Sequence, residues 1–359
     1  MAQIAAVAVR NTAQLELGIA LPEPMMAARE VLPPARKGLG FELGFDHARH
    51  GLTPPVELLF NQSPLLLGWQ AGAATFGRRA LKPSRHTRLW LQLRTHAWAR
   101  GRSFEEVQVT PNYLQQIAVE FCPILRRPLD ADTLSIDRVR DDAGYAAGNL
   151  AMLSRGANAA KAQHGWASAG ELARSVAQGP IRQIAGLGAA EWQRVAVLCS
   201  FVTELPHAEA AQIPLHVLPP NRLRLFNPIQ ALQALVTRQL ATPGWSARLA
   251  RLEALLPGEA LKADFNRFVL ALAPRVLQSA ALVEAQDIRW ALEDAWAQPL
   301  VQKRWTRFAL QLTAAQAEGL VQRAAAKRLC PVHVQAHARA GATEGWALER
   351  GGYRAATQH

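Results

Sequence analysis

The sequence predicts a mainly helical protein that carries one small strand–turn–strand–helix unit near its middle. Apolar residues recur at helical spacing in residues 84–99 and again in most of the chain after Glu171. Between these regions, residues 133–164 change to short segments, two of which are strand-like and the last of which is helical. The chain has 359 residues, half of them apolar, so it is long enough for two or three domains with cores of their own. We divide it into an N-terminal region (1–103), a middle module (104–166) and an all-helical C-terminal region (167–359).

The N-terminal region divides at about residue 77. Residues 1–77 are rich in proline and glycine and show only short apolar runs, so we expect no regular architecture there and expect this part to wrap the domain that follows. Beyond it, residues 84–99 predict a helix, because Leu89, Leu93 and Ala97 recur every four residues.

Basic residues are concentrated around this helix. The chain has a formal charge of +12, which favours polyanionic partners. Between residues 78 and 102 there is no acidic residue, whereas the basic residues are Arg78, Arg79, Lys82, Arg85, Arg88, Arg94, Arg100 and Arg102. Two interpretations remain open: a core helix with a solvated basic face, or a face that contacts phosphates with Trp90 and Trp98 as aromatic anchors.

The middle module begins with a helix start signal. Thr110 supplies a side-chain acceptor at the N-cap and Pro111 stands where no N–H is needed, which predicts a helix to about Phe121. The segments expected after Cys122 are a strand at 133–139, a turn at 141–148, a strand at 149–153 and a helix at 157–164.

The C-terminal region is predicted to be helical with one break. Residues 205–227 are rich in proline, and we interpret them as a linker or an extended crossing segment. Helices are expected beyond it at 228–240, 245–256, 259–277, 287–297 and 314–328. Residues 341–359 are expected to fray.

The stretch Leu134–Lys161 resembles the HNH (ββα-metal) endonuclease superfamily, in its phage-type and homing-type form. The resemblance is carried, in order, by Asp137-Arg138, Gly144-Tyr145, Gly148-Asn149, Asn158 and Lys161. It implies a ββα-metal unit inserted between helical regions, and hydrolysis of nucleic-acid phosphodiesters, DNA rather than RNA, with Mg²⁺ or Mn²⁺.

The resemblance also implies a role for each matched residue. Asp137 and Asn158 would be the metal ligands, since hard divalent cations bind oxygen. Asn149 would support the turn between the strands, and Arg138 and Lys161 would contact phosphate. The helix would lie in or across the minor groove.

The chain departs from the family at two places. Active members commonly have a histidine where this chain has Arg138, and an arginine cannot act as a general base. His164, Asp141 and Asp142 are poor substitutes. The zinc-binding CxxC pairs of related modules are replaced by a single cysteine in Cys122-Pro-Ile-Leu, so no structural zinc is expected and Cys122 is expected to be buried.

Three functions are therefore weighed. The first is a metal-dependent nuclease, the second a catalytically inactive DNA-binding or scaffold protein derived from one, and the third a helical domain that binds proteins through its C-terminal helices.

The matched residues also have simpler interpretations. Asp137 can be a turn or cap residue, and Asn158 a helix N-cap. The guanidinium groups of Arg138 and Arg140 can pair with the carboxylates of Asp141 and Asp142.

Cysteine usage and the lack of long apolar stretches favour a cytoplasmic protein. Cys122, Cys199 and Cys330 are too scattered for a disulfide framework, and neither a signal peptide nor a membrane span is predicted. Two further clusters, Asp46-His47 with His50 and Cys330 with His333 and His337, lack the remaining ligands of a metal site. For the first we expect local hydrogen bonding instead.

Overall fold

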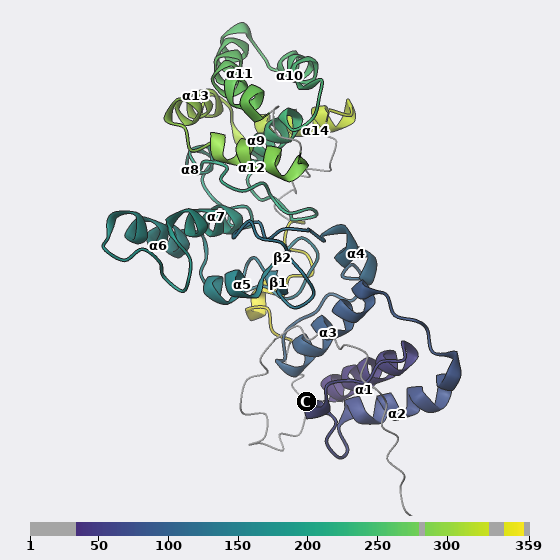
Figure 1. The fold of residues 1–359 in the computed structure, drawn as a ribbon. Helices are drawn as coiled ribbons and strands as arrows, with labels where there is room; N and C mark the ends of the chain where they lie inside the picture. Colours follow the sequence, from purple (N-terminus) through teal and green to yellow (C-terminus); the bar gives the residue numbers. More distant parts are fainter. Residues whose placement is uncertain (1–33, 280–283, 330–340, 355–359) are drawn as a thin grey trace, which may run out of the picture.

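The computed structural model describes residues 34–279, 284–329 and 341–354. In this part of the chain it has fourteen α-helices and one two-stranded antiparallel hairpin, which a helix follows directly. The prediction of a mainly helical fold with a central ββα unit is confirmed at this level. Figure 1 shows three tiers: the N-terminal helices at one end, the hairpin in the middle, and the last six α-helices at the other end. None of the helices in the described ranges is long and apolar enough to cross a membrane.

The described part of residues 1–77 is a helical hairpin, so the expectation of no regular architecture is wrong there. Helix α1 (Pro34–Arg49) packs along α2 (Pro64–Phe76), with short 3-10 turns at Val56–Leu58 and Gly77–Arg79. The contact depends on glycines: a Cβ at Gly44 would collide with the backbone of Leu65. A Cβ at Gly68 would likewise collide with the backbone of Phe41. A seam made of small residues carries no periodic apolar signal, which is why the sequence pattern did not reveal it.

Helix α3 (Arg85–Ala99) connects this hairpin to the middle module. Its predicted start is confirmed, since the side chain of Ser84 accepts a hydrogen bond from the N–H of Thr87. Leu91 and Trp98 pack on the α1–α2 hairpin, whereas Leu89 and Leu93 belong to the core of the middle module. Because it is covered on two sides, α3 buries more of its circumference than the predicted stripe.

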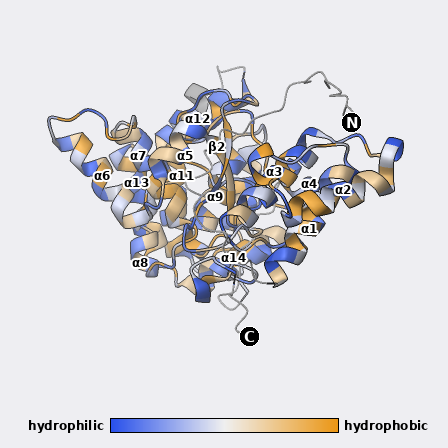
Figure 2. Ribbon diagram, turned by 90° about the horizontal axis from the view of Figure 1, so that it is seen from below, coloured by the Kyte–Doolittle hydropathy of each residue, from blue (hydrophilic) through white to orange (hydrophobic). Residues whose placement is uncertain are grey.

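The two strands of the middle module form a hairpin that is buried on both faces. Strand β1 (Leu134–Arg138) pairs with β2 (Leu150–Ser154), with Asp137 opposite Ala151. Leu134, Ile136, Leu150 and Met152 face α3 and α4 (Pro111–Gln116), whereas Ala151 and Leu153 join the core on the other side. Figure 2 shows hydrophobic residues around β2 in the centre of the molecule. Helix α4 begins at the predicted cap, Thr110, but ends at Gln116, before Phe121.

Helix α5 (Arg155–Lys161) follows β2 without a loop. Its N-cap is Ser154, whose hydroxyl accepts a hydrogen bond from the N–H of Ala157. The interpretation of Asn158 as an N-cap is therefore wrong, because Asn158 lies inside the helix. The helix ends at Lys161, and its C-cap residue, Ala162, has a positive φ of 43°.

The described part of the C-terminal region is mainly helical as predicted, but it has two helices that were not expected, a short one inside the proline-rich segment and one beyond it. The helices are α6 (Trp166–Gln178), α7 (Ala189–Ser200), α8 (His207–Ala210), α9 (Pro228–Leu240), α10 (Trp245–Glu253), α11 (Glu259–Ser279), α12 (Ala285–Ala295), α13 (Pro299–Ala309) and α14 (Ala314–Ala326). Helix α13 was not predicted, although Val301, Trp305 and Phe308 are spaced for one buried face. Its aromatic side chains pack with Phe268 and Trp296 in a common core.

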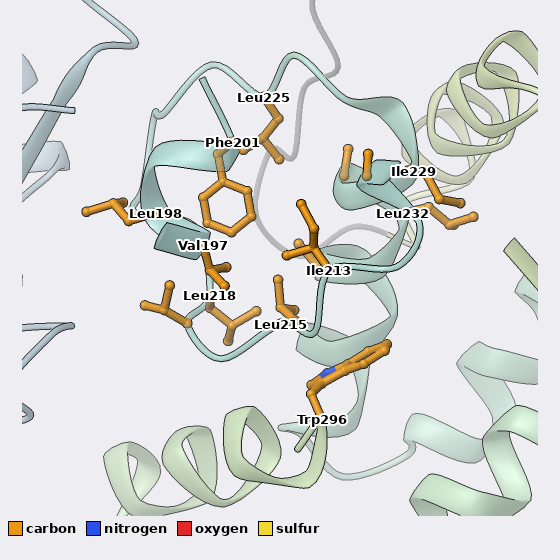
Figure 3. Close-up of a cluster of buried hydrophobic side chains, with 14 of the residues drawn as sticks. Val197, Leu198, Phe201, Ile213, Leu215, Leu218, Leu225, Ile229, Leu232 and Trp296 are labelled. Carbon is orange, nitrogen blue, oxygen red and sulfur yellow. The ribbon is translucent and has the colours of Figure 1, made fainter. Parts of the chain in front are cut away.

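The proline-rich segment 205–227 takes the extended crossing form rather than that of a linker. In Figure 3, Ile213, Leu215, Leu218 and Leu225 from this segment lie in the same buried cluster as Phe201 of the preceding stretch. The segment therefore joins the middle tier to the C-terminal helices through a shared core.

The C-terminal segment 341–354 returns to the ββα unit, where it appears in yellow in Figure 1. Trp346 is fully buried and donates from its indole N–H to the carbonyl of Ala147 at 3.1 Å. Gly144 donates to the carbonyl of Trp346, and Ser103 donates to that of Gly352. The prediction that this segment frays is wrong for residues 341–354, because its contacts are with residues some 200 positions away in the chain.

Candidate functional site

The candidate site lies between one face of β1 and helix α5. Side chains alternate across a strand, so Ser135 and Asp137 point to the same face, toward α5. The amide nitrogen of Asn158 donates to the hydroxyl of Ser135 at 2.7 Å. One helical turn later, the ammonium of Lys161 donates to Oδ1 of Asp137 at 3.2 Å and to the carbonyl of Arg138 at 3.0 Å. Helix positions three apart thus meet strand positions two apart.

The Asp137–Lys161 pair is closed off from solvent. Asp137 is 5% exposed and Lys161 is 0% exposed. Cys199 of α7 lies beside the pair, where its thiol donates to the carbonyl of Val139 at 3.8 Å and burial raises its pKa to about 11. An ion pair held inside a core keeps its charges only while both partners are present.

The electrostatics of the pair follow from this burial. Burial raises the pKa of Asp137 to about 6, against the opposing effect of the Lys161 ammonium. Burial also works against the charge of Lys161, but the neighbouring Asp137, Cys199 and Asp141 together outweigh it, so the pKa of Lys161 lies above its usual value. At neutral pH the pair is a carboxylate and an ammonium.

The residues present do not fit a hard divalent cation. Mg²⁺ requires six oxygen ligands in near-octahedral geometry. Asp137 is the only carboxylate on this face of β1, its Oδ1 already accepts from Lys161, and its Oδ2 is a buried acceptor with no partner in the described part of the chain. Within the described ranges, no three His, Cys, Asp or Glu side chains are grouped so that they could hold a metal ion. The amide of Asn158 is directed at Ser135.

Asn149 has the geometry of a support for the turn between the strands. It is fully buried, and its Oδ1 accepts from the N–H of Arg140 at 2.9 Å. Its Nδ2 donates to the carbonyls of Arg140 and Gly144, both at 3.1 Å. One side chain thereby holds both ends of the connection from β1 to β2.

Arg138 lies on the opposite face of β1 from Asp137 and is held within the same turn. Its guanidinium pairs with the carboxylate of Asp141 at 2.6 Å and donates to the carbonyls of Asp141 and Ala143. It also lies over the ring of Tyr145. Arg140 pairs with Asp142 at 2.8 Å, so the pairing we considered from the sequence is the one present.

The basic residues around α3 fall into two groups. Arg78, Arg79, Lys82 and Arg85 are exposed, and Arg88 is half-buried. Arg94 instead is 8% exposed, pairs with Asp46 at 2.6 Å and lies over the ring of Trp90. Its guanidinium joins α3 to α1 through this ion pair, so most of its donors are not accessible to a phosphate group.

The remaining predicted residues act structurally. Trp90 and Trp98 donate to the carbonyls of Val109 and Arg36, so these rings brace the fold. Cys122 is buried as expected, and its sulfur accepts from the N–H groups of Leu125 and Ser154.

Of the two histidine clusters singled out in the sequence, the structure describes the one at Asp46, His47 and His50. The ring of His47 bonds the carbonyl of Leu43, which is the local role expected of it. Cys330, His333 and His337 lie outside the described residues.

Two arginines that the sequence did not single out, Arg222 and Arg224, line a polar pocket next to the turn that Asn149 holds. Their spacing of two within an extended segment is the one local signal that would have indicated a shared face. Comparison of the chain with family models, with curated proteins and with solved structures gave no match.

Proposed function

We propose that this protein binds nucleic acid, DNA rather than RNA, through exposed basic residues, and that its ββα unit is an HNH-like module that serves as a scaffold and does not hydrolyse phosphodiesters. The observation that carries the proposal of a scaffold without hydrolytic activity is the buried Asp137–Lys161 pair. In an active module of this kind, the aspartate at the end of the first strand binds a cation that faces the substrate. Here an internal ammonium lies on that aspartate.

The accessible chemistry supports the same conclusion. Hydrolysis requires a group that deprotonates water, and Arg138, which follows Asp137, is permanently charged and held by Asp141. A substrate phosphate cannot approach Asp137 without displacing α5 or α7, because Asp137 is 5% exposed. Hydrolysis by Asp137 and Asn158 with Mg²⁺ or Mn²⁺ remains the alternative.

The proposed contact surface is the basic segment, defined as Arg78, Arg79, Lys82 and Arg85. All four side chains are exposed, and within the described part of the chain none forms an ion pair. No acidic residue occurs between positions 58 and 104. Four such contacts with phosphate would give a slope of roughly −3 to −4 in a plot of log affinity against log salt concentration.

Binding through C-terminal helices to a protein partner has less support. Three large aromatic rings of this region pack against one another: Phe268 of α11, Trp296 at the C-cap of α12 and Trp305 of α13.

The test combines binding and cleavage. We expect duplex DNA to bind, and expect the variant Arg78→Gln/Arg79→Gln/Lys82→Gln/Arg85→Gln to lose most of this affinity and of its salt dependence. The matched control removes four exposed charges elsewhere, as Arg174→Gln/Arg182→Gln/Lys303→Gln/Arg323→Gln, and so has the same net charge.

Equal losses in the two variants would show that binding reflects net charge alone and would contradict the proposed surface. In the same samples, cleavage that requires Mg²⁺ or Mn²⁺ and is lost in a folded Asp137→Ala variant would establish the enzyme instead.

A further inference from the structure

A polar pocket lies where the proline-rich segment crosses the middle module. It has a volume of about 280 Å³ and is formed by α4, the residue pair Ala147-Gly148 and residues 222–224. Its polar lining includes Thr110, Asn112, Tyr113 and Gln116. No part of the Asp137–Lys161 site contributes to it.

The pocket is positively charged. Arg222 and Arg224 both line it, whereas no acidic side chain does. The other polar groups of the wall are amides and hydroxyls, which can donate to an anion and also accept from hydroxyl or amino groups. A pocket wall of this composition suits an anion that carries further polar groups, rather than a metal ion or an apolar molecule.

The two arginines have different roles in the wall. Arg224 is 8% exposed and is fixed by hydrogen bonds to the carbonyls of Ala342 and Glu344. It closes the pocket and anchors the returning C-terminal segment. Arg222 is exposed and makes no hydrogen bond or ion pair within the described part of the chain.

The backbone at Arg222 has a positive φ of 63°, which is uncommon for a residue other than glycine. Such conformations cost free energy and gather at sites that bind ligands. Tyr113 also lines the pocket, and its hydroxyl accepts from the N–H of Gly148 at 2.9 Å, so its own proton is directed elsewhere and can be donated. Burial raises the pKa of Tyr113 to about 12, so this proton is retained at neutral pH.

We propose that this pocket binds the phosphate of a phosphorylated ligand of nucleotide size, with Arg222 as the direct charged contact. The Tyr113 hydroxyl and the amides of Asn112 and Gln116 supply further hydrogen bonds to the phosphate or to the group it carries. The phosphate comes either from a free mononucleotide or from the end of a nucleic-acid strand, and the chemistry of recognition is the same for both. This inference is independent of the proposed basic segment.

The test is calorimetric titration of the full chain with adenosine monophosphate and, in parallel, with adenosine. We expect saturable binding of the monophosphate and none of the nucleoside. Arg222→Gln should weaken binding of the monophosphate about tenfold or more, since a charge-assisted contact is lost. Arg182→Gln, which removes an exposed charge elsewhere, should leave it unchanged. Arg222 makes no hydrogen bond or ion pair with the residues that the structure describes, so the variant should keep the melting temperature of the parent protein.

A second arm separates the two sources of phosphate. A 5′-phosphorylated oligonucleotide that binds through the pocket should lose affinity in Arg222→Gln and compete with the monophosphate, whereas a site for free nucleotides should ignore the oligonucleotide. The inference is overturned if neither ligand shows saturable binding, or if binding is the same in Arg222→Gln as in the parent.

These outcomes are distinct from those for the basic segment. Loss of duplex binding only in the four-residue variant would support the proposed function without the pocket, and the reverse pattern would support the pocket without the proposed function.

Discussion

Replacing Lys161 by methionine tests the interpretation of the candidate site directly. Methionine has a similar length and keeps the apolar stem, but the ammonium is lost, so the carboxylate of Asp137 is left in a core where it is 5% exposed. Its Oδ2 has no partner in the described structure, and Oδ1 would lose its contact with Lys161. Removal of one partner of a buried pair typically costs about 3–5 kcal/mol of folding free energy.

The double variant Asp137→Leu/Lys161→Met provides the control. It removes both charges and keeps apolar volume, so its stability should lie within about 1 kcal/mol of the parent protein or exceed it. Urea unfolding followed by circular dichroism measures both free energies of unfolding. A loss of less than about 1 kcal/mol in Lys161→Met, or an equal loss in the single and double variants, would refute the reasoning.

The pH dependence adds an independent check. Without Lys161, the folded-state pKa of Asp137 should rise above the value of about 6 that it has with the ammonium present. A carboxyl group with a raised folded-state pKa binds protons more tightly in the folded protein, so its unfavourable contribution decreases as the pH falls. Lys161→Met should therefore be less destabilised at pH 5 than at pH 8. A penalty that does not change with pH would mean that Asp137 is not the source of it.

Three further predictions concern groups on which the fold depends. Burial lowers the pKa of His47 to about 4, so the stability that neutral His47 contributes is complete above about pH 6.5 and is lost as the pH falls toward 4. Over this range the free energy of unfolding should fall by about 3 kcal/mol. The variant His47→Met should therefore show a flatter pH dependence of unfolding. A slope unchanged in that variant would contradict the assignment. Asn149→Ala removes three hydrogen bonds from the connection between the strands and should cost about 2–4 kcal/mol in urea unfolding, whereas a loss below about 1 kcal/mol would show that the turn holds without it. Gly68→Ala should lower the melting temperature because the added Cβ would meet the backbone of Phe41. The control Gly38→Ala, on an open face of α1, should leave the melting temperature unchanged or raise it. Equal effects of the two substitutions would rule out close packing at the α1–α2 seam.

Local signals in the sequence were sufficient for much of the middle module. Thr110-Pro111 marked the start of α4, and the short strand-like segments at 133–139 and 149–153 marked both strands of the hairpin to within a residue. Asn149 and its connection were also recognisable, because the residues that hold this turn lie within nine positions of it. Such features depend on neighbours along the chain, and a local pattern can encode them.

Other features depend on residues that are distant in the chain, and only the tertiary structure decided them. Arg94 has the spacing of a solvated helix residue, yet it is buried because Asp46 of another helix meets it. The α1–α2 seam is formed by glycines, whose contribution is the absence of a side chain and therefore has no apolar period.

The candidate site shows the same division most clearly. The sequence alone indicated that Asp137 and Lys161 belong to one strand–helix unit. It also showed Arg138 and a single cysteine, Cys122, at positions where the resemblance to HNH modules leads one to expect a histidine and CxxC pairs. Whether Asp137 faces a metal ion in an open groove or an ammonium in a closed core depends on how α5 and α7 cover β1. The way these helices cover β1 depends on packing between segments up to sixty residues apart in the chain. The spacing of residues within one segment therefore does not predict it.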